Sequence, residues 1–405
     1  GVAMPTFLAD SLETPASLAQ SPAEIVFGSP TPPDYRTGDF KTFVIDNIVQ
    51  RSFADDSPVI GDVYIDGFGN GIPFDSSICT SSSVGTADGD IDLCGREWHT
   101  VLLSGARNGG GAYIALDVTN PSFGDCSTGD PVCEHVDPGS GTLEYPTHLW
   151  TLFDPDFGNT WSTASMGRIR LEVNDGGTTK TVDRWVMFVG GGLDPEDTDP
   201  TDGVDFGNAF VVVDIPTGRE IFKFHPDNPL PSGTGAPDNI DDMVCDVASR
   251  VGAFDINSDG YMDLAYVGDT CGRLWRFDIS EPIQVSGSIA QTGPSGTLDL
   301  IAEDWTGQIA FCANTDAECF GMSGPEVPQN NLEPIYFAPT VVLDDLGRRH
   351  VIFVTGDRRD PSSITKNGKL YNFIDDYIPA FIAGGTSLGG TTIKTADHFV
   401  NSGQV

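Results

Sequence analysis

The sequence predicts an all-β protein, and three observations lead to this prediction. The 405-residue chain contains 48 Gly and 28 Pro, a composition that suits many short strands joined by tight turns. Most of its 59 acidic residues are Asp, which favours turns and is a poor helix former. Short apolar runs rich in Val, Ile, Phe and Tyr recur along the chain, each bounded by Gly, Asp or Pro.

These runs have the length of strands and occur in order from residue 57 onward. The first 40 residues are rich in Pro and Ser and show little pattern. We therefore expect an N-terminal arm or linker at 1–45 and a single domain at 46–405. The predicted strand regions are 57–66, 99–106, 111–121, 184–192, 208–224, 262–280, 338–345, 350–357 and 368–375.

One element repeats within this series: a small residue, an aromatic-apolar strand, an Asp, a turn, and a second strand with an aromatic residue. It occurs as GAYIALDVTNP with the later HLWTLFDPD, as NAFVVVDIPTGREIFKF, as GRLWRFDIS and as GKLYNFID. The spacing is irregular, which suits the blades of a β-propeller separated by long inter-strand insertions. The alternative is one β-sandwich or a pair of them.

The charge of the chain limits its partners. With 59 acidic and 21 basic residues the formal net charge is -38, so nucleic acid and anionic membranes are excluded as natural partners, because phosphate binding requires clustered Lys and Arg. A hydrophobic content of 39% is sufficient for a buried core. Halophilic adaptation and calcium binding could each account for the acidity, and composition alone does not separate them.

The eight cysteines form four pairs of close neighbours in the sequence. An even number and local clustering favour disulfides and an oxidising compartment over a metal-binding set, because no CxxC motif occurs. The chain has no apolar run long enough to span a membrane and no recognisable signal peptide, so we expect that a signal peptide has been removed or that the sequence is a processed fragment. The expected disulfides join 79 with 94, 126 with 133, 245 with 271, and 312 with 319.

The most specific chemical motif is DINSDGYMD, at residues 255–263. Oxygen-bearing side chains at positions 1, 3, 5 and 9, a glycine at 6 and a backbone carbonyl at 7 are the pattern of a calcium loop. Position 12 is Tyr266 instead of the bidentate Glu of an EF-hand, and a strand-like run follows, so we expect a loop between strands. The alternative is an Asp-rich turn without an ion. The predicted ligands are Asp255, Asn257, Asp259, Tyr261 through its carbonyl, and Asp263.

Two other acidic stretches, at 194–205 and 88–92, could each hold a second cation. Neither has a glycine at the required offset, so we interpret both as solvated loops.

The stretch at 247–280, VASRVGAFDINSDGYMDLAYVGDTCGRLWRFDIS, resembles the signature of the C-terminal propeller domain of PilC/PilY-type type IV pilus tip proteins. Segments at 96–121, 148–169, 184–221 and 350–357 are similar to the same family and follow its order. The resemblance covers most of residues 57–375. The variable N-terminal half of full-length members is not part of this sequence, and the family's closing segment is hard to see beyond residue 375.

The resemblance implies a fold, a metal and a role. The fold would be an irregular seven-bladed β-propeller, and the family's calcium ligands fall on the five residues of the loop at 255–263. The role would be in pilus extension and retraction and in surface adhesion. The implied partners are minor pilins at the pilus tip and a host or abiotic surface ligand, and the implied location is extracellular, at the cell surface on the pilus tip.

The sequence favours a protein that is not an enzyme. It contains no HExxH, Walker A or Rossmann motif. Two alternatives remain. One is a quinoprotein dehydrogenase: NAFVVVDIPTGREIFKF resembles the blade repeat of that class, but the adjacent-cysteine pair of the class is missing here. The other is a carbohydrate-binding lectin propeller.

Overall fold

The structure is a computed structural model, and its described residues are almost entirely β. They contain 18 strands and one short 3-10 helix, Arg107–Gly109, which confirms the all-β prediction. Within this part of the chain no helix is long and apolar enough to cross a membrane. The described residues are 54–66, 96–118, 147–175, 178–194, 206–216, 218–226, 243–281, 283–286, 299–300, 305–314, 333–358, 368–379 and 394–395.

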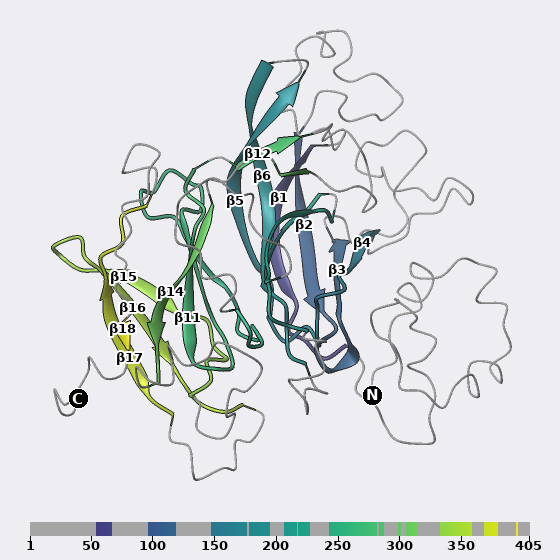
Figure 1. The fold of residues 1–405 in the computed structure, drawn as a ribbon. Helices are drawn as coiled ribbons and strands as arrows, with labels where there is room; N and C mark the ends of the chain where they lie inside the picture. Colours follow the sequence, from purple (N-terminus) through teal and green to yellow (C-terminus); the bar gives the residue numbers. More distant parts are fainter. Residues whose placement is uncertain are drawn as a thin grey trace, which may run out of the picture.

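The strands form four sheets, each built mainly from strands that are consecutive in the chain (Figure 1). The first sheet contains β1 (Val59–Asp66), β2 (Arg96–Gly105), β3 (Ala112–Asp117) and β4 (Thr147–Phe153). The second contains β5 (Ser165–Asp175), β6 (Thr178–Gly190), β7 (Phe210–Asp214) and β8 (Glu220–Phe224), extended beyond β5 by β12 (Ile283–Ser286) and β13 (Asp299–Leu300).

The third and fourth sheets follow the same plan. The third contains β9 (Gly252–Phe254), β10 (Leu264–Gly268), β11 (Arg273–Asp278) and β14 (Thr306–Cys312), with β18 (Lys394–Thr395) at its edge. The fourth contains β15 (Thr340–Leu343), β16 (Arg349–Val354) and β17 (Leu370–Asp375). The consecutive strands pair antiparallel, and only β12 with β5 and β14 with β18 pair parallel. Each sheet is therefore an up-and-down meander.

The sheets pack face to face in chain order, because the inner strands are apolar on both faces. In β7, Val211 and Val213 join the core shared with the first sheet. The alternate residue Phe210 joins the core shared with the third sheet, where its ring stacks on that of Phe277 with 3.9 Å between the centroids. Since side chains of a strand alternate between faces, a continuous apolar run serves two cores at once.

The third sheet repeats this arrangement. Ala265 and Val267 of β10 face the core shared with the second sheet, while Leu264 and Tyr266 face the fourth. The central sheets are thus covered on both sides, and Figure 1 shows the four sheets side by side in chain order.

A glycine ends the second strand of each of the first three sheets, where the segment leading to the next sheet crosses. A Cβ on Gly190 would lie 2.1 Å from the carbonyl oxygen of Val247, and one on Gly268 would lie 2.2 Å from Cγ2 of Ile335. Both contacts are shorter than any real Cβ contact, so only glycine allows neighbouring sheets to approach this closely.

The predicted strand regions can be compared with the strands of the structure. All nine predicted strand regions contain strands, whereas seven strands lie outside them: β4, β5, β9, β12, β13, β14 and β18. The described residues form four sheets, and seven blades closed into a ring remain a prediction. The boundary between residues 45 and 46 lies outside the described residues.

The predicted disulfide between Cys245 and Cys271 is present, with 5.9 Å between the Cα atoms. Cys312 is also disulfide-bonded. The other predicted cysteines, at 79, 94, 126, 133 and 319, lie outside the described residues.

Candidate metal centre

The loop at 255–263 connects β9 to β10 in the third sheet and lies against the second sheet. The backbone N–H of Asp263 donates to the carbonyl of Phe254 at 2.9 Å, which closes the loop. The N–H of Met262 donates to the carbonyl of Arg168 in β5 at 2.8 Å. As predicted, the loop joins two strands, and it also contacts a neighbouring sheet.

The carboxylate of Asp255 organises the turn. Its Oδ1 accepts hydrogen bonds from the N–H of Ser258 at 2.6 Å, and its Oδ2 accepts one from Gly260 at 2.7 Å. Gly260 has a φ of 89°, and Ser258, with a φ of 63°, adopts the left-handed conformation that side chains disfavour. Gly260 therefore takes the sharp turn predicted for it.

Asp263 is the buried acid of the loop, with only 2% of its surface exposed. Its Oδ2 accepts the N–H groups of Ile256 at 2.7 Å and Asn257 at 3.2 Å. Burial raises the pKa of Asp263 to about 6, and the negative charges of Asp259 and Asp255 add to the increase although the two N–H bonds oppose it. No ion pair among the described residues includes Asp263, so its charge lacks a cation.

Asn257 and Asp259 continue the same local pattern. The N–H of Asp259 donates to Oδ1 of Asn257 at 2.8 Å, and the N–H of Tyr261 donates to Oδ1 of Asp259 at 3.0 Å. Burial alone would raise the pKa of Asp259, but the Tyr261 N–H and the guanidinium of Arg170 lower it below its ordinary value. Asp259 is therefore held ionised.

In this arrangement the carboxylates accept backbone N–H groups instead of converging on one point. Among the described residues, no three His, Cys, Asp or Glu side chains are grouped so that they could hold a metal ion. The types of donor nevertheless fit a hard cation, since carboxylate, amide and carbonyl oxygens are the ligands of Ca²⁺. The five predicted ligands are adjacent in one loop, and their coordination of calcium remains a prediction.

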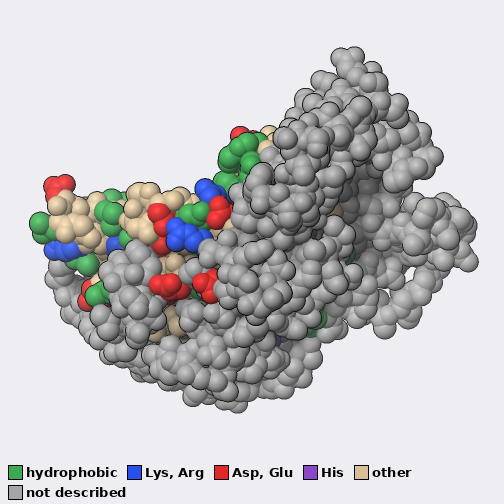
Figure 2. All heavy atoms as spheres, turned by 90° about the horizontal axis from the view of Figure 1, so that it is seen from above, with side chains coloured by type: hydrophobic (Ala, Val, Ile, Leu, Met, Phe, Trp, Pro, Cys, Tyr) green, Lys and Arg blue, Asp and Glu red, His purple; other side chains and the backbone are tan. Residues whose placement is uncertain are grey.

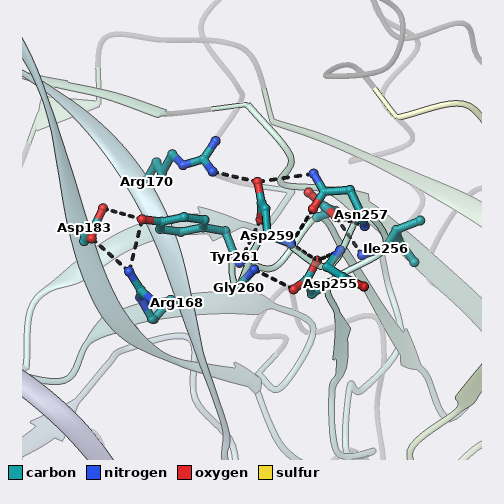
Figure 3. A network of polar contacts seen from close by, with 11 residues as sticks. Arg168, Arg170, Asp183, Asp255, Ile256, Asn257, Asp259, Gly260 and Tyr261 are labelled. Carbon is teal, nitrogen blue, oxygen red and sulfur yellow. Dashed lines mark hydrogen bonds and ion pairs between the residues drawn. The ribbon is translucent and has the colours of Figure 1, made fainter.

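Three residues beside the loop were not predicted from the sequence (Figure 3). Arg170 donates from Nη2 to Oδ2 of Asp259 at 2.6 Å. The hydroxyl of Tyr261 donates to Oδ1 of Asp183 in β6 at 2.8 Å, and Arg168 donates to the other Asp183 oxygen at 2.9 Å. The guanidinium carbons of Arg170 and Arg168 lie 3.9 Å and 4.6 Å from the centroid of the Tyr261 ring. Tyr261 thus anchors the loop through its side chain as well.

The sequence did indicate that the two arginines lie on one face of a strand. In GRIRL the two Arg residues alternate with apolar residues, which places both on one face of a strand while Ile169 and Leu171 enter the core. What the sequence did not indicate is which acidic group this face would meet. In the space-filling view (Figure 2), acidic and basic side chains lie interspersed on the part of the face formed by described residues.

Of the two other acidic stretches, residues 88–92 and 195–205 lie outside the described residues.

Comparison with known proteins finds relatives among the type IV pilus biogenesis factors. A 200-residue stretch, 49% of this chain, is 26% identical to the type IV pilus biogenesis factor PilY1 of Pseudomonas aeruginosa strain PAO1 and covers 12% of that protein. With PilY1 of strain UCBPP-PA14 the identity is 24% over 309 residues, which is 75% of this chain and 19% of the relative. A PilY1 homolog of Xylella fastidiosa is 25% identical over 187 residues, 45% of this chain and 10% of that protein.

The chain is similar to type IV pilus biogenesis factors of the PilY1 type. It spans between 10% and 19% of the length of these PilY1 relatives. No family model matches the chain. Among solved structures, the C-terminal domain of Pseudomonas aeruginosa PilY1 is similar at 22% identity and a TM-score of 0.45, over 82% of this chain and 51% of that one.

The relationship to PilY1 confirms the resemblance found in the sequence. The names of these relatives state one activity, the biogenesis of type IV pili.

Proposed function

We propose that this chain is the calcium-binding part of a protein associated with the tip of the type IV pilus. It would act in pilus assembly, extension and retraction, and in surface adhesion, and it would not be an enzyme. Its partners would be minor pilins and a host or abiotic surface ligand, outside the cell at its surface.

The observation that carries the calcium proposal is the buried carboxylate of Asp263. It lies in a loop with Asp255 and Asp259, its negative charge has no cationic partner among the described residues, and burial raises its pKa. A buried charge without a partner is costly, and a bound cation removes that cost. Ca²⁺ is the cation whose ligand preferences match carboxylate, amide and carbonyl oxygens in a tight loop.

The pilus part of the proposal is supported by the relatives, which are named type IV pilus biogenesis factors. Their similarity extends over up to 75% of this chain. The acidic composition suits a partner surface that is not itself strongly anionic.

The architecture that we propose is an irregular propeller in which the four observed sheets are blades. Two features support this: each sheet is a meander of consecutive strands, and each packs face to face on the next in chain order. Seven blades would require further blades beyond these four sheets.

Calorimetric titration of the purified 405-residue chain with calcium chloride tests the metal site. We expect one high-affinity site in the wild type, and at least a hundredfold weaker binding in Asp255→Ala, because the substitution removes both a ligand and the group that organises the turn. The matched control is Asp344→Ala. Asp344 also accepts N–H groups at the head of a turn, from Leu346 and Arg348 at 2.9 Å each, but lies outside the loop. Unchanged affinity in Asp255→Ala would contradict the proposed site.

The pilus association is tested separately, in cells that carry the full-length protein. We expect the protein to co-purify with sheared pilus filaments and to remain in the supernatant of a strain without pili. Equal recovery from both strains would contradict the association.

A further inference from the structure

Arg170 already supplies a positive charge to one of the proposed calcium ligands. Its Nη2 lies 2.6 Å from Oδ2 of Asp259, and the same oxygen accepts the amide of Asn257 at 3.3 Å. A guanidinium in contact with a carboxylate oxygen occupies the region that a metal ion on that oxygen would need, and two cations this close repel each other.

The ion pair is open to exchange with ions in solution. The Arg170 and Asp259 side chains are 36% and 33% exposed, so water and ions reach both groups. Ion pairs this exposed contribute little to stability, and a divalent cation with several oxygen ligands binds the carboxylate more strongly. Arg170 can therefore hold Asp259 in the absence of metal and release it when a stronger cation arrives.

Arg170 also has a second contact, which it keeps when it releases Asp259. Its guanidinium carbon lies 3.9 Å from the centroid of the Tyr261 ring, a cation–π contact that does not involve a carboxylate. The ring itself is fixed, because the Tyr261 hydroxyl donates to Asp183 at 2.8 Å and accepts a hydrogen bond from Arg168 at 3.1 Å. Release of Asp259 would thus leave Arg170 on a fixed aromatic surface.

We infer that Arg170 is an internal counter-cation of the loop, which competes with calcium for Asp259 and so raises the calcium concentration at which the site fills. The inference rests on the proposed calcium function and adds a regulatory residue from a neighbouring sheet. It has a consequence for selectivity: monovalent cations, which offer no more charge than the guanidinium, gain little by displacing it, whereas divalent cations gain more. Filling of the site would also free the β5 arginine from its ion pair with the loop, while its contact with the Tyr261 ring remains.

Calorimetric titration of the full 405-residue chain with calcium chloride tests the inference. We expect Arg170→Gln to bind calcium about three to ten times more tightly than the wild type, because the competing cation is gone. Without calcium, amide hydrogen exchange in the loop at 255–263 should be faster in Arg170→Gln than in the wild type, since Asp259 has lost its partner.

Arg348→Gln is the matched control. It removes the same charge from another exposed ion pair, in which Arg348 Nε lies 2.6 Å from Oδ2 of Asp344, outside the loop. We expect its calcium affinity to stay within a factor of two of the wild type. Unchanged or weaker binding in Arg170→Gln, or an equal gain in Arg348→Gln, would overturn the role of Arg170 alone. A wild type that does not bind calcium would overturn the proposed function itself.

Discussion

Arg276 in β11 and Asp375 at the end of β17 form a buried ion pair between the third and fourth sheets, with 2.8 Å between Nη1 and Oδ1. The other carboxylate oxygen accepts the hydroxyl of Tyr266 at 2.5 Å. Burial by itself would raise the pKa of Asp375, but the guanidinium of Arg276 outweighs it and lowers the pKa. An Asp ends the third strand of every sheet, and all four are buried: Asp117, Asp214, Asp278 and Asp375.

This recurring Asp predicts a strong effect on stability. Asp375→Ala should destabilise the protein by about 3 to 5 kcal/mol, because it leaves the buried Arg276 without its partner. The neighbouring exposed residue provides the control, and Asp376→Ala should change stability by no more than about 0.5 kcal/mol. Urea unfolding followed by circular dichroism measures both. Similar effects from the two substitutions would show that the ion pair does not hold the sheets together.

Because the second and third sheets approach closely at Gly190, a single added methyl group there should lower the stability of the protein. Gly190→Ala should destabilise the protein by about 3 kcal/mol, because the new Cβ meets the backbone carbonyl of Val247. That carbonyl cannot move without shifting the segment that leads from the second sheet to the third. Gly347→Ala is the control: it has a positive φ of 74° but no atom within 4 Å of its Cβ, so only the backbone cost of about 1 to 2 kcal/mol applies. Equal losses in thermal unfolding would exclude the steric explanation.

A buried lysine in β8 predicts a dependence of stability on pH. Lys223 contacts Asp154 at 2.6 Å, Asp156 at 2.8 Å and Glu220 at 3.4 Å. Burial raises the pKa of Glu220 from 4.5 to about 7 despite the lysine, and the charge of Asp154 adds to the increase. Between pH 4.5 and 7 the folded protein therefore holds a proton that the unfolded chain has lost, so this group's contribution to stability falls as pH rises through that window.

Glu220→Gln should remove that contribution. We expect the difference in unfolding free energy between wild type and variant to change by about 1 to 3 kcal/mol from pH 5 to pH 8, with the variant relatively more stable at pH 8. Glu172→Gln, in β5 of the same sheet, is the control and should leave the pH profile parallel to that of the wild type. A Glu220→Gln profile that also stays parallel would show that Glu220 is ionised throughout.

Removal of calcium should have a local effect. The loop carries three acids that would repel one another without the ion, while the other sheets keep their own cores. Calcium at a hundredfold excess over its Kd adds about 2.7 kcal/mol, enough to order one part of the molecule but not to fold all of it. With a chelator we expect faster hydrogen exchange confined to about residues 245–280, most of which lie within the chain segment closed by the Cys245–Cys271 disulfide. Global unfolding, no change, or the same response in Asp255→Ala would contradict this picture.

The sequence by itself determined strands β6, β7, β8, β10 and β11 of the central sheets and the turn of the proposed calcium loop. Both are local: the apolar run at 210–214 is long enough to be a strand whatever it packs against, and Gly260 takes the positive φ that the motif requires. Strands with weak local signals were missed, such as β9, with three residues, and β14, which contains Gly307 and the buried polar Gln308.

Only the tertiary structure decided which charged groups meet. Arg170 lies 89 residues before Asp259, and Arg276 lies 99 residues before Asp375, so no local pattern joins either pair. Their contacts exist because consecutive sheets stack face to face, which brings β5 against the loop of the next sheet and the end of β17 against β11. Side-chain alternation can be read from sequence because it follows from the geometry of a single strand. The partner across an interface cannot, since it depends on how two sheets pack.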